Sequence, residues 1–438
     1  MAILTREEAQ AILKKALSFS KADECEITLT GNNGGNIRYA GNEVSTSGAE
    51  ENLAMSVESR FGRRSGTATI NEFDDKSLEK VVRRAEETAR IAPESPEYIE
   101  LLGPQKYITS KEYFDSTAKI DPAYRADAAE KSIEAAAAKD LEAAGFLEHY
   151  TSFMALMNSK GLFAYHPSTV IDFSVTTRTK DGTGSGYVTQ DYSDASKLDT
   201  GKLSQIAATK AANSRNAKAL EPGKYTVVLE PTAAADLLQI MFRSMDLRNA
   251  EEGRSFLSKA GGKTKLGEKL VDERVTVYSD PTNPDVPSAP FSGDGLPQEK
   301  ITWIEKGVMK NMPNTRYWAS LKGVKPVPRP GNFIMEGGDQ SLEELIKGTQ
   351  RGILVTRFWY IRSVDPQTLL NTGLTRDGTF YIENGKIMYP VKNFRFNESP
   401  VIMLNNLDAL GKPQRISGNL IPPMRIRDFT FTSLSDAV

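Results

Sequence analysis

The sequence is poor in the residues that disulfide frameworks and most protein metal sites require. It contains one cysteine, Cys25, and only two histidines, His149 and His166. A single cysteine excludes an intramolecular disulfide and fits a reducing compartment, and we interpret Cys25 as a small buried residue. Zinc sites are built mostly from histidine and cysteine, and the sequence has no short-spaced pair of these residues. We therefore interpret the histidines as one surface and one loop residue, and we expect no metal and no other cofactor.

The chain also lacks a strong net charge and a long apolar segment. Its formal net charge is −2, and basic pairs such as Arg63-Arg64 are balanced by acids, so no surface for nucleic-acid phosphates is indicated. No segment approaches the roughly 20 continuous apolar residues of a membrane-spanning helix. Thr5 and Glu8 have the spacing of a capping box that opens a helix, which is unlike a signal peptide. We expect a cytoplasmic protein that binds neither membrane nor nucleic acid.

What is present is typical of a large globular protein. Of 438 residues, 39% are hydrophobic and 26% are charged, and a chain longer than about 250–300 residues usually divides into domains. Helical and strand patterns alternate up to Pro222-Gly223, and strand patterns dominate after it. We predict the α+β class, with a mixed helix and strand N-terminal half followed by a β-rich C-terminal domain. The expected units are residues 1–100, 101–222 and 223–438.

Local patterns place individual elements in the N-terminal half. Runs rich in β-branched and aromatic residues predict separate strands at 25–32, 35–44 and 52–70, joined by hairpin-like turns. Apolar residues spaced three and four apart predict a helix from Asp75 to Ile91. Further helices are predicted within 123–146 and 202–220.

The C-terminal half has equally clear local signals. A strand at 224–230 precedes a helix that begins at Pro231. Asn384-Gly385, between two alternating segments, predicts a tight hairpin. Ser341 and Glu344 predict the start of a short helix.

Three motifs resemble catalytic or nucleotide-binding signatures but lack the full pattern. Gly262-Lys263-Thr264 ends like a phosphate-binding loop, yet Leu257 stands where that loop needs its first glycine. We interpret this segment as a loop between strands. The sequence "GTGSG", residues 182–186, reads as a loop, and it does not form a nucleophile elbow after a strand. Asp199-Thr200-Gly201 leads into a helix, where Asp or Thr is an ordinary N-cap.

A glycine-rich loop and an aromatic and arginine cluster remain as candidates for a binding site. The loop is "PFSGDGLP", residues 290–297, with one carboxylate, and the cluster is "NTRYWAS", residues 314–320. Together they are suited to line a groove for an extended peptide backbone.

The order of these and other segments resembles the PmbA/TldD family. In the C-terminal half the resemblance rests on "GKYTVVLEPTAAADLL", "EGRSFLSKAGGKTKLGEKLVDERVTVYSDP", "FSGDGLP", "IEKGVMKNM", "NTRYWAS", "SLEELI" and "IENGKI". In the N-terminal half, "RYAGNEVSTSGAEENLAMSVESRFGRRSGTATI" is similar to the family's first domain. The resemblance extends from about residue 20 to the C-terminus. It also implies that the Gly-Lys-Thr segment is a loop without a nucleotide.

The family has two branches, which differ at the helix after the strand "YTVVLE". The TldD branch carries His-Glu-x-x-x-His there, and the matching positions of this chain are Gln239, Ile240 and Ser244. An amide, an alkane and a hydroxyl do not bind zinc tightly, and an alkane cannot act as a general base. The cysteine ligand of that branch has no counterpart in "RISGNLIPPMRIRDF". The chain therefore resembles the TldE or PmbA branch, which implies a metal-free partner subunit of TldD.

The resemblance implies a role in peptide processing. TldD and TldE together form a cytoplasmic protease that degrades or trims unfolded peptides, including the maturation of modified peptide antibiotics. Two motifs of this chain depart from the family's usual form. Ser292 and Gly293 replace two acidic residues of Phe-Asp-Asp-Glu-Gly, and Trp318 replaces a small residue.

Three hypotheses follow. The first is a non-catalytic subunit that guides unfolded peptide to a TldD-like metallopeptidase subunit; the second is a stand-alone homodimer that binds peptides without cleaving them. The third is an enzyme that uses a carboxylate pair including Asp294. Under the first hypothesis, the residues that border the peptide groove are Phe291, Gly293, Asp294, Gly295, Arg316 and Tyr317.

Overall fold

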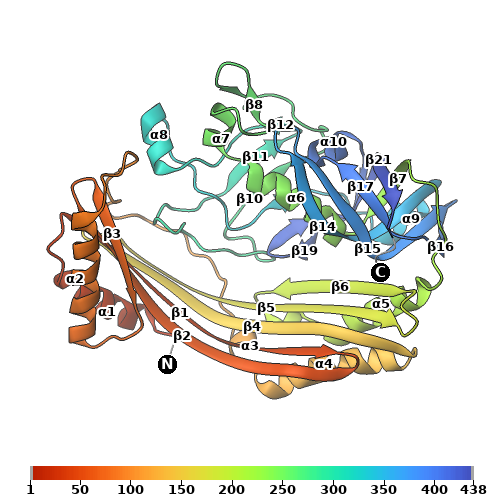
Figure 1. Cartoon of the computed structure of the whole chain (residues 1–438), viewed down its shortest axis with the longest axis horizontal. Coiled ribbons are helices and arrows are strands. Elements are labelled where there is room, and N and C mark those ends of the chain that lie inside the picture. Colours follow the sequence, from red (N-terminus) through yellow and green to blue (C-terminus); the bar gives the residue numbers. More distant parts are fainter. Residues whose placement is uncertain (1–2, 436–438) are drawn as a thin grey trace.

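One long antiparallel sheet forms the base of the N-terminal half (Figure 1). The computed structural model describes residues 3–435, and the sheet has the strand order β3-β2-β1-β4-β5-β6. Its strands are β1 (Glu24–Ala40), β2 (Glu43–Phe61), β3 (Arg64–Ile70), β4 (Leu141–Asn158), β5 (Phe163–Thr179) and β6 (Ser185–Tyr192). The sheet is curved, and the C-terminal half lies over its concave face (Figure 1). The sheet contains strands from both of the N-terminal units that the sequence predicts, 1–100 and 101–222.

Strand β1 corrects the prediction of two strands separated by a turn. It continues through the glycine and asparagine residues 31–36, because each residue there has a partner on both neighbouring strands; Gly34, for example, lies opposite Glu50 and Tyr150. A Cβ atom at Gly34 would lie only 2.2 Å from the carbonyl oxygen of His149. Glycine is therefore needed here for close approach of the backbones rather than for a turn.

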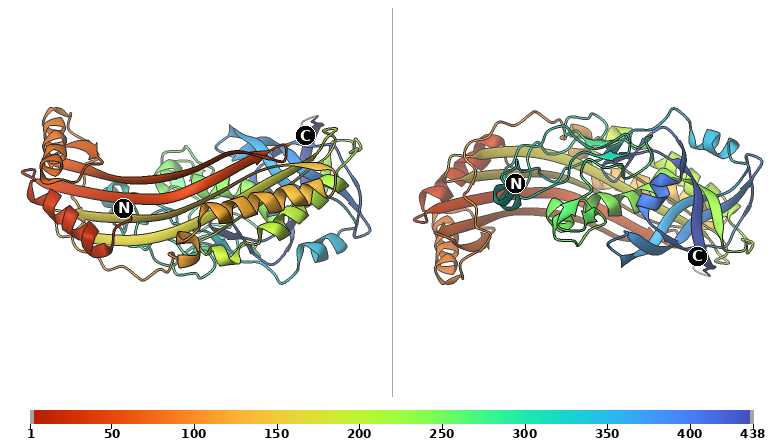
Figure 2. Two further views of the ribbon diagram at one scale, coloured as in Figure 1. Left: turned by 90° about the horizontal axis from the view of Figure 1, so that it is seen from below. Right: turned by 90° about the horizontal axis from the view of Figure 1, so that it is seen from above.

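Helices cover the convex face of the sheet in two groups (Figure 2). At one end lie α1 (Arg6–Ser18) and α2 (Asp75–Ile91), which share a core with the first half of β1. At the other end α4 (Pro122–Ala137) and α5 (Thr200–Asn213) share a second core with the last part of β1. The short α3 (Asp115–Ala118) and η1 (Ala195–Lys197) complete this half. The predicted helix at 75–91 and the Thr5 to Glu8 capping box are confirmed.

Two predicted helices are too long. The helix expected within 123–146 ends at Ala137, and β4 begins at Leu141 after Asp140 takes a left-handed φ of 56°. The helix expected within 202–220 ends at Asn213. Alanine favours helix locally, but residues 141–146 instead pair with β5, and pairing across the sheet decides the outcome.

The outer edge of the sheet at β2 is only partly covered. Strand β3 pairs with Met55 to Phe61 of β2, which leaves residues 43–54 with a partner on one side only. This stretch is mostly polar and exposed, and it includes Glu43, Glu50 and Glu51.

The C-terminal half contains a ring of strands and a second sheet, which confirms the predicted α+β class. The order of strands in the ring is β14-β7-β21-β17-β15, and β15 closes the ring by pairing with β14. Two further strands are attached to the ring: β16 pairs with β15, and β18 pairs with β21. These strands are β7 (Lys224–Leu229), β14 (Arg351–Asp365), β15 (Leu370–Glu383), β16 (Lys386–Pro390), β17 (Phe394–Glu398), β18 (Leu407–Leu410) and β21 (Met424–Leu434).

The second sheet has the order β12-β11-β10-β13-β20-β19, and β8 and β9 form a small separate hairpin. These strands are β8 (Ser258–Lys259), β9 (Lys263–Thr264), β10 (Val277–Ser279), β11 (Ile301–Glu305), β12 (Val308–Met309), β13 (Ile334–Met335), β19 (Gln414–Ile416) and β20 (Asn419–Ile421). Of the Gly-Lys-Thr motif, which the sequence predicts as a loop between strands, Gly262 lies in the turn after β8, whereas Lys263 and Thr264 form β9 itself. The predicted Asn384-Gly385 hairpin joins β15 to β16.

Helix α6 (Pro231–Ser244) lies in the core of this half. Its apolar residues Leu237, Leu238 and Met241 are all fully buried. The remaining helices are α7 (Leu247–Glu251), α8 (Arg316–Lys322), α9 (Leu342–Lys347) and α10 (Pro400–Asn405). Among the helices within residues 3–435, none has the length and apolar character needed to cross a bilayer.

The prediction of one surface and one loop histidine is wrong. Both histidines lie buried on strands, His149 on β4 and His166 on β5. His166 Nε2 is 2.7 Å from a carboxylate oxygen of Glu112, and His149 Nε2 is 3.0 Å from Nη1 of the buried Arg125. Burial and the nearby guanidinium lower the pKa of His149 to about 4. The sequence pattern missed this because the partners come from other elements.

Candidate functional site

The predicted glycine-rich loop is an ordered turn. Two backbone hydrogen bonds fix the loop: the Ser292 N–H donates to the Leu296 carbonyl at 2.9 Å, and the Gly295 N–H donates to the Ser292 carbonyl at 2.9 Å. The Ser292 hydroxyl also donates to Asp294 Oδ1 at 2.5 Å. Gly295 has a φ of +80°, a left-handed value that favours glycine. The loop therefore holds Asp294 in a defined place.

Two residues anchor the loop to the N-terminal half. The Phe291 ring is 3% exposed and its centre lies 5.1 Å from that of Tyr107. The Tyr107 hydroxyl donates to the Gly295 carbonyl at 2.8 Å. A Cβ atom at Gly295 would lie 2.9 Å from Leu162 Cδ1, so this glycine also permits the close approach. Gly293 and Asp294, which lie between the anchored residues Phe291 and Gly295, remain exposed.

A pocket of about 470 Å³ opens beside this loop. The loop forms one wall, and the proline-rich segment 327–331 and the residues before α8 form the others. Of the six predicted groove residues, the wall includes Phe291, Gly293 and Asp294 but not Gly295, Arg316 or Tyr317.

The pocket lies at the C-terminal end of α6. Asp246, two residues beyond that helix, is part of the pocket wall and accepts a hydrogen bond from Arg329 Nη2 at 3.1 Å. Arg329 Nη1 donates to the Arg243 carbonyl of α6 at 3.1 Å. The same helix carries the positions that the resemblance links to zinc, so the structure brings the glycine-rich loop and this helix end to one place.

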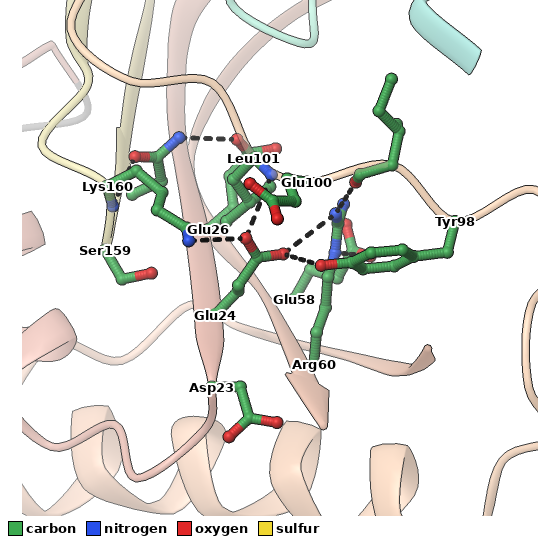
Figure 3. A network of polar contacts seen from close by, with 12 residues as sticks. Asp23, Glu24, Glu26, Glu58, Arg60, Tyr98, Glu100, Leu101, Ser159 and Lys160 are labelled. Atoms are coloured by element: carbon green, nitrogen blue, oxygen red, sulfur yellow. Dashed lines mark hydrogen bonds and ion pairs between the residues drawn. The ribbon is translucent and has the colours of Figure 1, made fainter. Parts of the chain in front are cut away.

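A network of charged residues lies at the start of the long sheet (Figure 3). Its centre is Glu24 on β1, which is 4% exposed and accepts hydrogen bonds from the Tyr98 hydroxyl at 3.2 Å and the Leu101 N–H at 3.3 Å. Arg60 and Lys160 form ion pairs with Glu24 at 3.7 and 3.3 Å (Figure 3). The buried carboxylate is thus fully satisfied, which marks it as a structural centre.

Asp294 and Arg316 lie within the field of this network. Burial raises the pKa of Glu26, which lies two residues along β1, and the charge of Asp294 adds to this rise. Burial lowers the pKa of Arg316, while Asp294 and Glu26 oppose that effect. Burial also raises the pKa of Tyr107 to about 12, with contributions from the same two carboxylates. Glu26 was not identified from the sequence, because β1 contains other polar and charged residues, such as Glu24 and Arg38, and nothing distinguishes Glu26 from them.

Helix α8 positions the arginine and aromatic cluster. Arg316, its first residue, donates to the Glu100 carbonyl, and Tyr317 is half-buried. The Trp318 indole N–H donates to Glu251 of α7 at 2.7 Å, and the guanidinium of Arg248 lies 5.0 Å from the Trp318 ring centre. The tryptophan that replaces a small residue thus attaches α8 to α7.

The positions matched to the zinc motif do not fit a zinc ion. The Gln239 side-chain oxygen accepts a hydrogen bond from Arg243 Nη2 at 3.1 Å, and the Ser244 hydroxyl donates to the Ile240 carbonyl at 2.7 Å. These groups are weak or impossible zinc ligands. Within residues 3–435, no group of three or more His, Cys, Asp or Glu side chains could hold a metal ion.

Asp236, one turn before these positions, was not identified from the sequence. Its Oδ2 atom accepts the Phe358 N–H of β14 at 2.8 Å, in a short regularly paired stretch between two irregularities of that strand. Burial raises the pKa of Asp236 to about 7, against the opposing effects of that N–H and of Arg357. A single Asp within an apolar helix carries no sequence signal for such a contact.

Family models match three successive parts of the chain. They are described as PmbA/TldA metallopeptidase domain 1 at residues 25–89, the central domain at 114–215 and the C-terminal domain at 222–433. A curated metalloprotease of Methanothermobacter thermautotrophicus is 24% identical over 288 residues, which are 60% of this chain and 61% of that protein. The chain spans about half to three-fifths of the length of the archaeal relatives of this kind. Metalloprotease PmbA of Escherichia coli O157:H7 is 22% identical over 465 residues, covering 97% of this chain and 98% of the relative.

Solved structures share the whole fold. A putative modulator of a DNA gyrase from Thermotoga maritima superposes with a TM-score of 0.86 at 19% identity, covering 97% of this chain and 100% of that one. TldE from Thermococcus kodakarensis gives a TM-score of 0.86 at 18% identity, covering 97% and 99%.

Proposed function

This chain belongs to the PmbA/TldD metallopeptidase family, and we propose that within it the chain is a metal-free, peptide-binding subunit. It guides unfolded peptide to a zinc-bearing, TldD-like partner in the cytoplasm. The match to PmbA along nearly the whole chain supports this reading. We expect it to bind no nucleic acid.

One observation carries the proposal. The pocket beside the glycine-rich loop lies at the end of α6, where Gln239, Ile240 and Ser244 stand in place of zinc ligands and a general base. The family's binding architecture is therefore present without the donor atoms that hydrolysis at zinc needs. Such a chain contributes position: it holds a peptide so that the partner's reaction becomes effectively intramolecular.

The pocket offers contacts suited to a peptide. Asp294 is exposed at its wall and shares an electrostatic field with Glu26 and Arg316. A peptide amine or basic side chain in the pocket pairs with the Asp294 carboxylate, and a peptide carboxylate that extends beyond the pocket wall pairs with the Arg316 guanidinium. The exposed backbone around Gly293 is available for hydrogen bonds to an extended main chain.

A reconstitution experiment tests the subunit role. The purified chain is assayed for bound metal and for hydrolysis of an unfolded peptide, alone and with a TldD-like subunit. We expect hydrolysis only in the mixture and no stoichiometric zinc in this chain. Hydrolysis or tightly bound zinc in the isolated chain would contradict the proposal. No hydrolysis in either sample would favour a homodimer that binds peptides without cleaving them.

A second experiment tests the pocket. Asp294→Ala and Tyr317→Ala should each slow peptide processing by the reconstituted pair. Asp127→Ala, which removes another exposed aspartate, on α4, serves as the matched control and should leave the rate unchanged. Unchanged rates in both variants, Asp294→Ala in the pocket wall and Tyr317→Ala on the adjoining helix α8, would show that the peptide binds elsewhere.

A further inference from the structure

A larger groove lies between the two halves, apart from the pocket at the glycine-rich loop. Its volume is about 1030 Å³. One wall consists of β6 and α5, and the opposite wall consists of β16, α9 and β19. Strands β6, β16 and β19 are each the last strand of their sheet. Three sheet edges therefore meet at one groove.

The β6 wall presents backbone groups that β5 does not use. The Thr179 N–H donates to the Gly184 carbonyl at 2.9 Å, which makes these residues a hydrogen-bonded pair at the turn between β5 and β6. In an antiparallel ladder the bonded pairs alternate, so the N–H and C=O groups of Tyr187 and Thr189 point away from β5. Lys210 Nζ, 3.4 Å from the Tyr187 carbonyl, agrees with this direction. Within residues 3–435, the backbone of Thr189 has no partner beyond its own sheet.

The β16 wall also presents backbone groups that its neighbouring strand, β15, does not use. Asn384 and Gly385 have φ values of 50° and 74°, as in the two-residue turn of a tight hairpin. Glu383 and Lys386, which flank the turn, then form the hydrogen-bonded pair, and the backbone groups of Ile387 point away from β15. The Ile387 side chain is 48% exposed. The Pro390 carbonyl at the other end of β16 already accepts the Lys218 N–H at 2.9 Å, so Ile387 supplies the open donor and acceptor of this wall, as Thr189 does for β6.

The side chains between these walls are largely apolar. Ile206 of α5 is 38% exposed and Met388 of β16 is 52% exposed, although both line the groove. Leu342 and Phe380 lie in the same lining. Lys210 and Glu230, which also line the groove, pair with each other at 2.6 Å. The other charged residues of the lining are two cations, Lys202 and Lys412, and two anions, Asp339 and Glu343, so the charges of the groove balance in sign.

We propose that this groove binds an extended peptide segment with apolar side chains at alternate positions. The segment adds as a strand to the free edges of β6 and β16, where its main chain pairs with Thr189 and Ile387. Alternate side chains then face the apolar lining, since successive side chains of a strand point to opposite sides. The inference rests on the proposed peptide-binding function and names a second site that grips the same chain.

The test uses the isolated chain and a fluorescein-labelled peptide of alternating valine and serine. Ile387→Pro removes one outward N–H without removing a bond to β15, and an edge strand tolerates proline. We expect roughly fivefold to tenfold weaker binding by fluorescence anisotropy. Ile387→Ala, which keeps the N–H, should bind more tightly than the proline variant. Ile402→Ala, an exposed isoleucine on α10, is the off-site control and should bind like the original chain.

A second variant covers the case in which Ile387→Pro disturbs folding. Ile206→Glu places a charge in the apolar lining from an exposed helix position, and it should weaken probe binding to a similar extent. Hydrogen exchange of the complex should show protection at the Thr189 and Ile387 amides. Protection confined to residues 291–295 would overturn this second site and leave the proposed function intact. Absence of probe binding, with peptide still processed by the reconstituted pair, would have the same meaning.

Discussion

Gly295 combines two requirements that only glycine meets. Its φ is +80°, and a side chain would approach Leu162 and Leu156 to 2.9 and 3.1 Å. Gly295→Ala should lower the free energy of unfolding by about 1–3 kcal/mol, measured by urea denaturation. Gly293→Ala is the matched control, because nothing lies within 4 Å of its added Cβ. Equal effects of the two substitutions would show that the loop does not depend on this close contact.

The buried His149 makes stability depend on pH. Its pKa is lowered from 6.5 to about 4 in the folded chain, so the unfolded chain binds an extra proton between these values. The free energy of unfolding should therefore fall as the pH drops from about 6.5 to about 4, by no more than about 3 kcal/mol from this residue.

His149→Gln, which carries no titrating group, tests this dependence. Urea denaturation at several pH values should give a shallower loss of stability in the variant over that window. The slope is compared rather than the absolute stability, because the substitution also changes packing next to Arg125. Identical slopes in both proteins would assign the acid sensitivity to other groups.

Three side chains attach helix α8 to its neighbours: Arg316 donates to the Glu100 carbonyl, Lys322 pairs with Glu251 at 3.1 Å, and Trp318 is buried. Trp318 is 9% exposed and donates its indole N–H to Glu251. Trp318→Ser, which restores the small residue usual in the family, should speed amide exchange across residues 316–322. It should also make the hydrogen bond from Arg316 to the Glu100 carbonyl less stable. Leu321→Ser, at a position 59% exposed on the same helix, should leave exchange unchanged.

The contact between α6 and β14 contains a partly buried acid, Asp236. The pKa of Asp236 is raised from 3.8 to about 7, so the folded chain holds an extra proton between these values and loses stability as the pH rises through them. Asp236→Asn keeps an acceptor for the Phe358 N–H and removes the charge. It should stabilise the chain by roughly 1–3 kcal/mol at pH 8 and have no such effect at pH 4. Thermal unfolding at both pH values measures this difference, and a constant offset would contradict it.

The elements that were predicted correctly are those in which local signals agree with the fold. Helix α2 has both an apolar stripe and an Asp74 cap, and the β15 to β16 hairpin has the residues that its turn requires. The errors arose where distant pairing overrides local preference. The glycines in β1 resemble a turn locally, and the alanines at the start of β4 resemble a helix, but both segments have partners across the sheet.

In the candidate site, too, residues with a local sequence signal were identified and residues whose environment depends on distant segments were not. Asp294 and Arg316 are recognisable because they lie within distinctive short motifs. Glu26 and Asp236 are not, because their environments come from loops and strands far away in the sequence. Sequence reasoning finds residues that share a motif, whereas it cannot show which remote elements bring a carboxylate into an apolar setting.

At the scale of the whole molecule, one buried ion pair joins the halves. Arg415 Nε donates to Asp191 Oδ2 of β6 at 2.9 Å, and both side chains are less than 10% exposed. Arg415→Leu leaves the carboxylate without its cation, and it should cost about 3–5 kcal/mol in denaturant unfolding.

A double-mutant cycle separates the pair from its surroundings. Adding Asp191→Asn to Arg415→Leu should recover part of the loss, because it removes the isolated charge. Purely additive effects would mean that the ion pair does not couple the two halves.

The uncovered part of β2 has a consequence for behaviour at high concentration. A strand edge of this length is a ready template for uncontrolled aggregation between copies. Here the edge carries Glu43, Glu50 and Glu51 on an exposed, mostly polar segment. A second copy pairing along it would bring glutamates close to glutamates, which is unfavourable. The longest open edge of the sheet is therefore protected against self-association by its own composition, whereas the edges that border the groove keep their capacity to accept a strand.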